Sequence, residues 1–178
     1  VWTYDGFGNV ETETRPDGTT RTTTMHKDGT GSGAYAHHYS VIHESGKPAR
    51  RLYVDMLGRP VRQITRSFEG TGINVFTRYS AKGYVWRVSE PFFGGTQAIW
   101  NTYSYDDVGR ITSFTAADPT ASTTTVYDGF KTSVTDSAGR TEVRRVDVAG
   151  RVRSVDDKDG VRAVFYYDKV GNRYKVRT

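Results

Sequence analysis

The residues most able to do chemistry in this sequence are its aspartates, because they recur at nearly constant spacing. Asp136, Asp147, Asp157 and Asp168 each stand three residues before a glycine. Two carboxylates that share one site can divide the roles of acid and base, as some hydrolases require. An aspartate at the first position of a type I turn, however, accepts hydrogen bonds from the backbone that follows it. The regular distance to glycine predicts this turn role, so we expect no catalytic residue and no enzyme activity.

One of these stretches, Asp136-Ser137-Ala138-Gly139, superficially resembles the active-site triplet of aspartic proteases. That mechanism needs two such carboxylates in one site. The stretch keeps register with the turns before and after it, so we interpret it as one more turn. The chain contains no Gly-x-Ser-x-Gly elbow, phosphate-binding loop or paired zinc-binding motif.

A group of histidines is the candidate metal site. His37, His38 and His43 lie close together in the sequence, and Glu44 follows them. Successive side chains of a strand point to opposite faces, which places His37 and His43 on one face and His38 on the other. Three imidazoles therefore do not converge as a zinc site requires. The sequence predicts neither a metal site nor a bound cofactor.

The charge balance raises the question of a nucleic-acid partner. Lys and Arg number 25 against 20 Asp and Glu, a formal net charge of +5. The arginines are dispersed, and several are placed to meet the turn aspartates. The doublets Arg50-Arg51 and Arg144-Arg145 put neighbouring residues on opposite faces of a strand. This distribution argues against nucleic-acid binding.

The composition favours a β protein. Aromatic residues make up 13% of the 178 residues, including 12 tyrosines, while hydrophobic residues reach only 35%. No window shows a 3.6-residue apolar period, and no apolar run approaches the roughly 18 residues of a membrane span. There is no cysteine, so we expect either a cytosolic protein or one stabilised by size and repetition. No amino-terminal signal precedes the first motif, and we expect the chain to be an excised fragment.

The stretch from Tyr105 to Ile111 gives the clearest turn. Gly109 supplies the positive φ that closes a hairpin through a one-residue bulge. In that geometry Asp106 faces Arg110 across the closing pair, and Tyr105 faces Ile111 one step further back. Cross-strand pairs of these kinds contribute roughly 0.2–1 kcal/mol each.

The same turn recurs along the chain and divides it into segments. We interpret residues 1–178 as a single repeat region, with first hairpins at 1–29, an irregular segment at 30–52, spaced repeats at 53–115 and regular repeats at 122–178. In the last segment alternate turns recur every 21 residues, so the repeating unit is a two-strand hairpin. The predicted fold is all-β: a repetitive antiparallel β-hairpin array that twists and therefore curls.

The residues predicted to form the turn motif are structural rather than catalytic. They are Tyr4, Asp5, Gly8, Asp55, Gly58, Gly83, Tyr105, Asp106, Gly109, Arg110, Asp136, Gly139, Asp147, Gly150, Arg151, Asp157, Gly160, Tyr167, Asp168 and Gly171. Serine replaces aspartate in the copy at Ser80 and serves the same role more weakly.

The motif Tyr-Asp-x-x-Gly-Asn/Arg-Val/Ile resembles the YD repeat of the Rhs family. Its best copies are Tyr4–Val10, Tyr105–Ile111 and Tyr167–Asn172. The family includes bacterial Rhs and insecticidal toxin-complex proteins and the teneurins of animals. The resemblance implies a spiral β-hairpin shell that encloses a polypeptide, commonly a toxin. It also implies that the partners are the remainder of the shell and its cargo, in a secreted or bacterial cell-surface protein.

The sequence also departs from the family pattern. The tyrosine is replaced by Val54, Thr135 and Val146, and the carboxy-terminal core motif that accompanies self-cleavage in many members is not evident. An alternative function therefore stays open at this stage. Tyrosines on an exposed sheet face suit sugar rings, so the chain could be a surface module that binds glycans or a cell wall.

Overall fold

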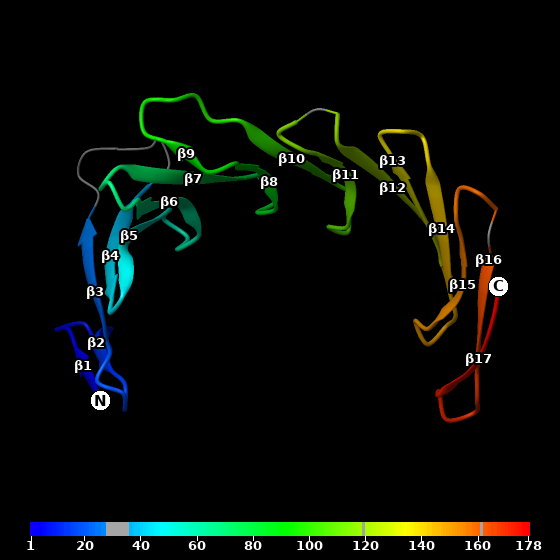
Figure 1. Ribbon diagram of the computed structural model, residues 1–178, viewed down its shortest axis with the longest axis horizontal. Helices are drawn as coiled ribbons and strands as arrows, with labels where there is room; N and C mark the ends of the chain where they lie inside the picture. Colours follow the sequence, from blue (N-terminus) through cyan, green and yellow to red (C-terminus); the bar gives the residue numbers. More distant parts are fainter. Residues whose placement is uncertain (28–35, 119, 161) are drawn as a thin grey trace. The chain divides into compact units, whose positions relative to one another are not determined.

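The protein is built from antiparallel strands. The computed structural model describes residues 1–27, 36–118, 120–160 and 162–178, and this part of the chain contains no helix (Figure 1). Its strands pair with their neighbours in sequence through short turns, in the manner of a meander. The prediction of an all-β array of antiparallel hairpins is therefore confirmed.

The described part of the chain divides into two compact units, Val1–Trp100 and Asn101–Thr178. The first unit contains β1 (Trp2–Tyr4), β2 (Val10–Thr14), β3 (Thr20–Lys27), β4 (His38–Glu44), β5 (Lys47–Val54), β6 (Pro60–Arg66), β7 (Gly72–Tyr79), β8 (Val85–Ser89) and β9 (Phe92–Phe93). β10 (Trp100–Tyr105) begins at the boundary. The second unit continues with β11 (Ile111–Thr115), β12 (Ser122–Asp128), β13 (Lys131–Asp136), β14 (Thr141–Val146), β15 (Val152–Asp156), β16 (Arg162–Tyr167) and β17 (Arg173–Arg177).

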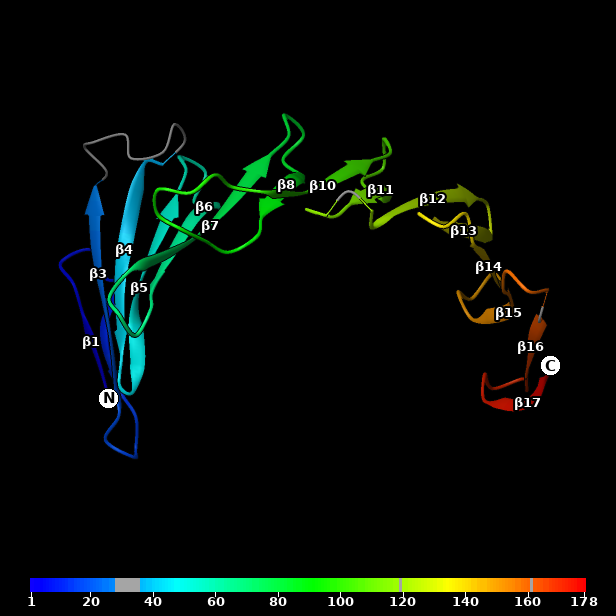
Figure 2. The same ribbon diagram turned by 45° about the horizontal axis from the view of Figure 1, so that its top comes forward.

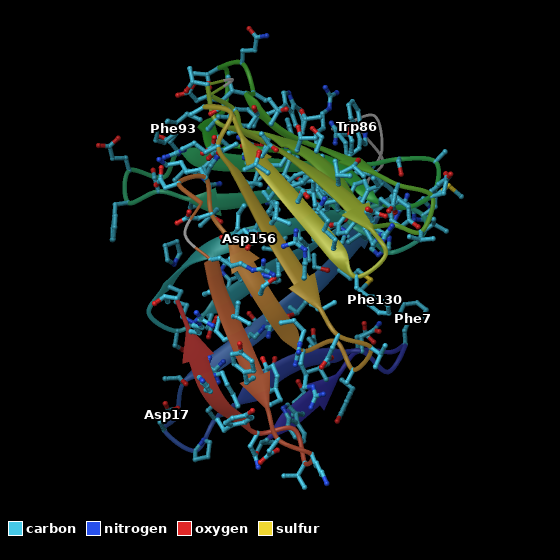
Figure 3. The ribbon with its side chains drawn as sticks, turned by 90° about the vertical axis from the view of Figure 1, so that its right-hand side faces the viewer. Phe7, Asp17, Trp86, Phe93, Phe130 and Asp156 are labelled. Carbon is cyan, nitrogen blue, oxygen red and sulfur yellow. The ribbon has the colours of Figure 1, made fainter. Side chains whose placement is uncertain are left out.

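The first unit is a twisted strip. β3, β4 and β5 lie side by side (Figure 2). The strand direction turns steadily from β3 to β7 (Figure 1), as the right-handed twist of a sheet requires. Figure 3 places Phe7 and Trp86 on one side of this unit and Asp17 and Phe93 on the other. Successive turns therefore alternate between the two edges of the strip.

The strip buries its core by stacking side chains across strands. His26, Tyr39, Tyr53, Arg62 and Phe76 are consecutive cross-strand partners on β3 to β7. The His26 and Tyr39 rings lie 5.0 Å apart, the Tyr39 and Tyr53 rings 5.1 Å apart, and the Arg62 guanidinium lies 5.3 Å from the rings on either side of it. Tyr53 is only 5% exposed. Rows of this kind hold neighbouring strands in register.

The segment 30–52 is less regular in sequence, but Glu44-Ser45-Gly46-Lys47 is expected to form a turn between two strands, and the structure has a regular hairpin there. β4 and β5 pair from His38 opposite Val54 to Glu44 opposite Lys47, around Ser45 and Gly46. This turn is shorter than the Asp-x-x-Gly turn and lacks its aspartate. The sequence also predicts a turn at Lys27-Asp28-Gly29, of which Asp28 and Gly29 lie outside the described residues.

Candidate functional site

The turn at Asp106 shows how the motif works. The Asp106 backbone N–H donates to the Arg110 carbonyl at 3.0 Å, and the Gly109 N–H donates to the Asp106 carbonyl at 3.1 Å. The Asp106 carboxylate accepts through Oδ1 from the N–H groups of Val108 and Arg110, at 3.1 and 2.9 Å. Its Oδ2 accepts from Arg110 Nε at 2.7 Å. Gly109 has φ +86°, and Tyr105 pairs with Ile111, so the predicted closing geometry of this turn is confirmed.

The same carboxylate geometry recurs at the other turns. Arg59, Arg140 and Arg151 each donate from Nε to the aspartate four residues earlier, at 2.8, 2.6 and 2.8 Å. Asn9 and Asn172 donate a side-chain amide to Asp5 and Asp168 instead, at 3.0 and 3.3 Å. The glycines of the motif, Gly8, Gly58, Gly83, Gly139, Gly150, Gly160 and Gly171, have φ between 75° and 95°. The carboxylate of each of these aspartates thus accepts hydrogen bonds from residues of its own turn.

Two copies differ in detail. At Ser80 the hydroxyl accepts from the Tyr84 N–H at 3.2 Å, while the backbone bonds of the turn are kept. At Asp157 the carboxylate accepts from the Asp159 N–H at 2.9 Å, and the Gly160 N–H donates to the Asp157 carbonyl. Both side chains stabilise the turn as an aspartate or serine at its first position can.

The closing arginine also contacts the next hairpin, a contact that the sequence reasoning missed. The Arg110 guanidinium lies 4.2 Å from the ring centroid of Tyr127. The Tyr127 hydroxyl donates to the Ile111 carbonyl at 3.0 Å. The Asp106 carboxylate therefore fixes the Arg110 side chain, and the Arg110 guanidinium packs on the Tyr127 ring. The Tyr127 hydroxyl in turn donates to the carbonyl of Ile111, the residue after Arg110. We call this arrangement an Asp–Arg–Tyr step.

The step occurs three times among the described residues. Arg59 lies 4.4 Å from the Tyr79 ring, whose hydroxyl donates to the Pro60 carbonyl at 2.9 Å. Arg151 lies 5.0 Å from the Tyr167 ring, whose hydroxyl donates to the Val152 carbonyl at 2.9 Å. Cation–π contacts of this kind contribute about 0.5–2 kcal/mol, depending on exposure. The tyrosine of one turn is thereby tied to the arginine of the preceding turn on the same edge of the sheet.

The glycines of the following turns leave room for these arginines. A Cβ added to Gly83 would lie 3.7 Å from Arg59 NH1, and one added to Gly171 would lie 3.4 Å from Arg151 NH1. The guanidinium therefore lies against the glycine as well as against the tyrosine of the next turn. The two glycines serve both the positive φ of their own turns and the contact between turns.

Not every predicted residue joins a step. Arg140 pairs with Asp136, but its side chain is 59% exposed. Tyr4 is 57% exposed. The predicted motif residues are distributed along the strips rather than gathered in one pocket, so the arrangement supports cohesion between hairpins and not joint action of carboxylates on a substrate.

We predict that Tyr127→Phe lowers the free energy of unfolding of the second unit by about 0.5–1.5 kcal/mol. The ring and its contact with Arg110 remain, but the bond to the Ile111 carbonyl is lost. Urea unfolding followed by near-ultraviolet circular dichroism measures the change. Tyr174→Phe is the matched control, because Tyr174 is 67% exposed and is expected to change little. Equal effects of the two substitutions would contradict the role of the hydroxyl.

The turns lower the pKa of their aspartates. At Asp136 and Asp168 the first cause is the backbone N–H of the closing residue, which donates to the carboxylate and lowers its pKa. At Asp55, Asp106 and Asp147 partial burial is the largest single cause and raises the pKa. The hydrogen bonds and charge of the closing arginine, together with a second backbone N–H, lower the pKa by more in sum. All five carboxylates are therefore more acidic than the ordinary value of 3.8.

This shift predicts acid sensitivity. A carboxyl group whose folded pKa is depressed contributes stability above its unfolded pKa, and the contribution is lost as the pH falls through the folded pKa. We expect the urea midpoint to stay constant from pH 7 to about pH 5 and to fall steeply below about pH 4. Asp136→Asn is expected to make this fall shallower in the second unit. The same substitution at Asp159, whose side chain is 64% exposed, serves as the control.

The histidine candidates form a pair rather than a cluster. His37 Nδ1 and His38 Nδ1 lie 3.3 Å apart, and the two rings meet edge to face. Over the described ranges, no group of three His, Cys, Asp or Glu side chains is close enough to hold a metal ion. Within the same residues, no helix is long and apolar enough to cross a membrane.

Comparison with known proteins identifies the fold. No protein-family model and no curated protein matches the sequence. A chain of the crystal structure of TcdB2-TccC3-Cdc42 superposes with a TM-score of 0.62 over 83% of this chain, at 16% identity. The fold is shared. The matched part spans 10% of that chain.

Proposed function

We propose that this chain is a structural repeat region of an Rhs-type toxin or toxin-complex protein, forming part of the wall of a shell. The fold likeness to a chain of TcdB2-TccC3-Cdc42 is the observation that carries the proposal. The YD-like motifs of the sequence support it independently. In this proposal the wall encloses a toxin or another polypeptide, and the parent protein is secreted or displayed on a bacterial surface.

The Asp–Arg–Tyr steps suit a wall. A single sheet strip resists bending along its strands, but successive hairpins are joined mainly by one ladder of backbone bonds. A step adds a ring contact and a hydroxyl bond between neighbouring turns of the same edge, and an ion pair within the first of the two, as at Asp147, Arg151 and Tyr167. The wall would isolate its contents by stiffness alone, so the proposal assigns no catalytic residue and no cofactor.

Electron microscopy of the full-length protein that contains these residues tests the proposal. We expect a hollow particle whose wall includes this strip and whose interior holds further density. In parallel, a polypeptide inside the wall should resist trypsin in the intact particle and become sensitive when the particle is opened at low pH. An open filament, or equal sensitivity before and after opening, would contradict containment.

Glycan binding depends on tyrosine faces that are open to solvent. Tyr79, Tyr127 and Tyr167 are each covered by an arginine and bonded through the hydroxyl. Tyr4 and Tyr174 are exposed, at 57% and 67%. We therefore favour the wall. Saturable binding on a glycan array that is lost in Tyr4→Ala or Tyr174→Ala would favour the alternative.

A further inference from the structure

One face of the first unit carries a hollow between two arginines. Its volume is about 310 Å³, which lies within the range of pockets that bind small ligands. Its lining comes from β4, β5, β6 and β7 and includes Val41, Ala49, Arg51, Ile64, Arg66 and Gly72. Three arginines and one histidine belong to this lining, but among the described residues no Asp or Glu does. The hollow is therefore basic and partly apolar.

Strand register places the two arginines on the same face. Arg51 of β5 is the direct cross-strand partner of Val41 on β4 and of Ile64 on β6. Residues two apart on a strand point to the same face, so Ile64 and Arg66 share a face. The cross-strand partner of Arg66 on β7 is Gly72. The direct cross-strand neighbours of both arginines are thus uncharged, and none of them can neutralise a guanidinium.

Small residues keep the hollow open. Ala49 lies two residues before Arg51 on β5 and so on the same face, and Gly72 has no side chain. A Cβ added to Gly72 would lie 3.1 Å from Ile64 Cγ2, so a larger residue would press on the Ile64 side chain. Val41 and Ile64 are half-buried and supply apolar surface to the lining. A ligand in this hollow would therefore meet both charge and apolar surface.

Both guanidinium groups keep donors available. The ion pairs among the described residues include neither Arg51 nor Arg66, and both residues are exposed. The Arg51 guanidinium carbon lies 6.0 Å from the ring centroid of Tyr39. Arg66 donates from NH1 to the Gly70 carbonyl at 2.7 Å, which fixes one end of its guanidinium. Most of the N–H groups of the two side chains can therefore donate to a ligand.

We propose that this hollow binds a small organic anion, whose carboxylate, sulfate or phosphate group is held by Arg51 and Arg66 and whose apolar body packs on Val41 and Ile64. The planar fork of arginine matches the oxygens of such groups. Since a water molecule takes about 30 Å³ of the liquid, the hollow has room for much more than an inorganic ion. The proposal is independent of the wall function, because it rests on one face of the first unit.

Matched probes separate the charge from the apolar body. Sodium benzoate and sodium phenyl phosphate carry both, acetate and inorganic phosphate carry only the anionic group, and benzyl alcohol carries only the ring. Each is titrated against sodium chloride at equal ionic strength and followed by proton–nitrogen correlation NMR at the backbone amides of Arg51, Ile64 and Arg66. We expect saturable shifts with benzoate or phenyl phosphate, and binding about 10-fold weaker or less with the other three compounds. The compound that binds should also raise the urea midpoint, because it binds the folded state.

Substitutions locate the site. Arg51→Met and Arg66→Met are expected to weaken binding about 10-fold or more, because each removes charged hydrogen bonds to the anion. Ala49→Leu should weaken it with both arginines present, because the longer side chain enters the hollow. Arg153→Met removes an exposed charge from the second unit and should leave binding unchanged.

Tryptophan emission shows whether the first unit of each variant is folded, since all three tryptophans lie in it. Arg51→Lys keeps the charge, loses the planar fork and provides the test where a methionine variant does not fold. Four results would overturn the proposal: no saturation with either ring-bearing anion, equal binding of acetate and benzoate, saturation that survives the arginine substitutions, or an equal loss in Arg153→Met.

Discussion

Asp55→Ala is expected to lower the free energy of unfolding of the first unit by about 2–4 kcal/mol. Asp55 is buried, and its Oδ1 accepts from the N–H groups of Leu57 and Arg59 at 2.9 Å each. Its Oδ2 is paired with Arg59 at 2.7 Å. Alanine leaves two backbone donors and one guanidinium without these acceptors. Breaking a buried ion pair costs about 3–5 kcal/mol, and the 33% exposure of Arg59 reduces that figure.

The loss should extend beyond the turn itself. Asp55 orients Arg59, and Arg59 lies over the Tyr79 ring, whose hydroxyl is bonded to the Pro60 carbonyl. An arginine released from Asp55 leaves that ring face more exposed. The expected cost therefore includes part of the contact between the hairpins β5–β6 and β7–β8.

The first unit can be followed separately, because Trp2, Trp86 and Trp100 all lie in it. Urea unfolding monitored by tryptophan emission measures the change. Met56→Ser is the control within the turn, since Met56 is 83% exposed. Asp136→Ala removes the equivalent hydrogen bonds from the second unit. It should leave the urea midpoint that tryptophan emission reports for the first unit unchanged. A midpoint for Asp55→Ala equal to that of Met56→Ser would contradict the turn role.

The turns could be predicted from the sequence because their determinants are local. The aspartate, the glycine and the closing residue lie within five consecutive positions, and the chemistry of each residue fixes its place. The pairing of Tyr105 with Ile111 follows from that geometry. The same reasoning predicts antiparallel strands, because a short turn can join no other kind.

The Asp–Arg–Tyr steps could not be predicted in this way. The tyrosine and the carbonyl that it meets are 19, 16 and 15 residues apart in the three copies. The separation depends on the length of the turn at the opposite edge, which the motif does not specify. A regular 21-residue period would therefore miss the contact. The available signal was the tyrosine that precedes the next aspartate on the same edge, as at Tyr127 and Tyr167.

The cross-strand pairing of Arg78 with Arg87 and the division into two units depend on contacts that local spacing does not specify. Strand register decides that the two arginines are opposite each other, and Trp100 reaches them from beyond the irregular stretch around β9. Composition and local spacing carry no record of such contacts.

Gly150→Val is expected to destabilise the β14–β15 hairpin by about 1–3 kcal/mol. Gly150 has φ +77°, a conformation that a β-branched residue adopts only with strain. A Cβ at this position would meet nothing within 4 Å, so the cost comes from the backbone and not from a clash. Gly150→Asn should cost less, because asparagine tolerates the left-handed region better. Ala149→Val tests a β-branched residue at the adjacent position, where φ is not positive.

Amide hydrogen exchange measures the effect residue by residue. A loss of 1–3 kcal/mol in local opening corresponds to exchange about 5–150-fold faster. The first amides to respond should be those of Ala149 and Arg151, which donate to Asp147 Oδ1 at 2.9 and 3.0 Å. Exchange in Gly150→Val equal to that in Ala149→Val would contradict the requirement for glycine.

How far the faster exchange spreads along the chain tests whether the Asp–Arg–Tyr step couples neighbouring turns. Asp147 and Arg151 close the altered turn, and Arg151 covers Tyr167 of the following hairpin. If the step couples neighbouring turns, exchange should also accelerate at Val170 and Asn172, whose N–H groups donate to Asp168. Adding Tyr167→Phe to Gly150→Val should reduce that spread, because it removes the bond to the Val152 carbonyl. Acceleration confined to β14–β15 in both variants would mean that each hairpin opens alone, and the stiffness assigned to the wall would then depend on the backbone ladder.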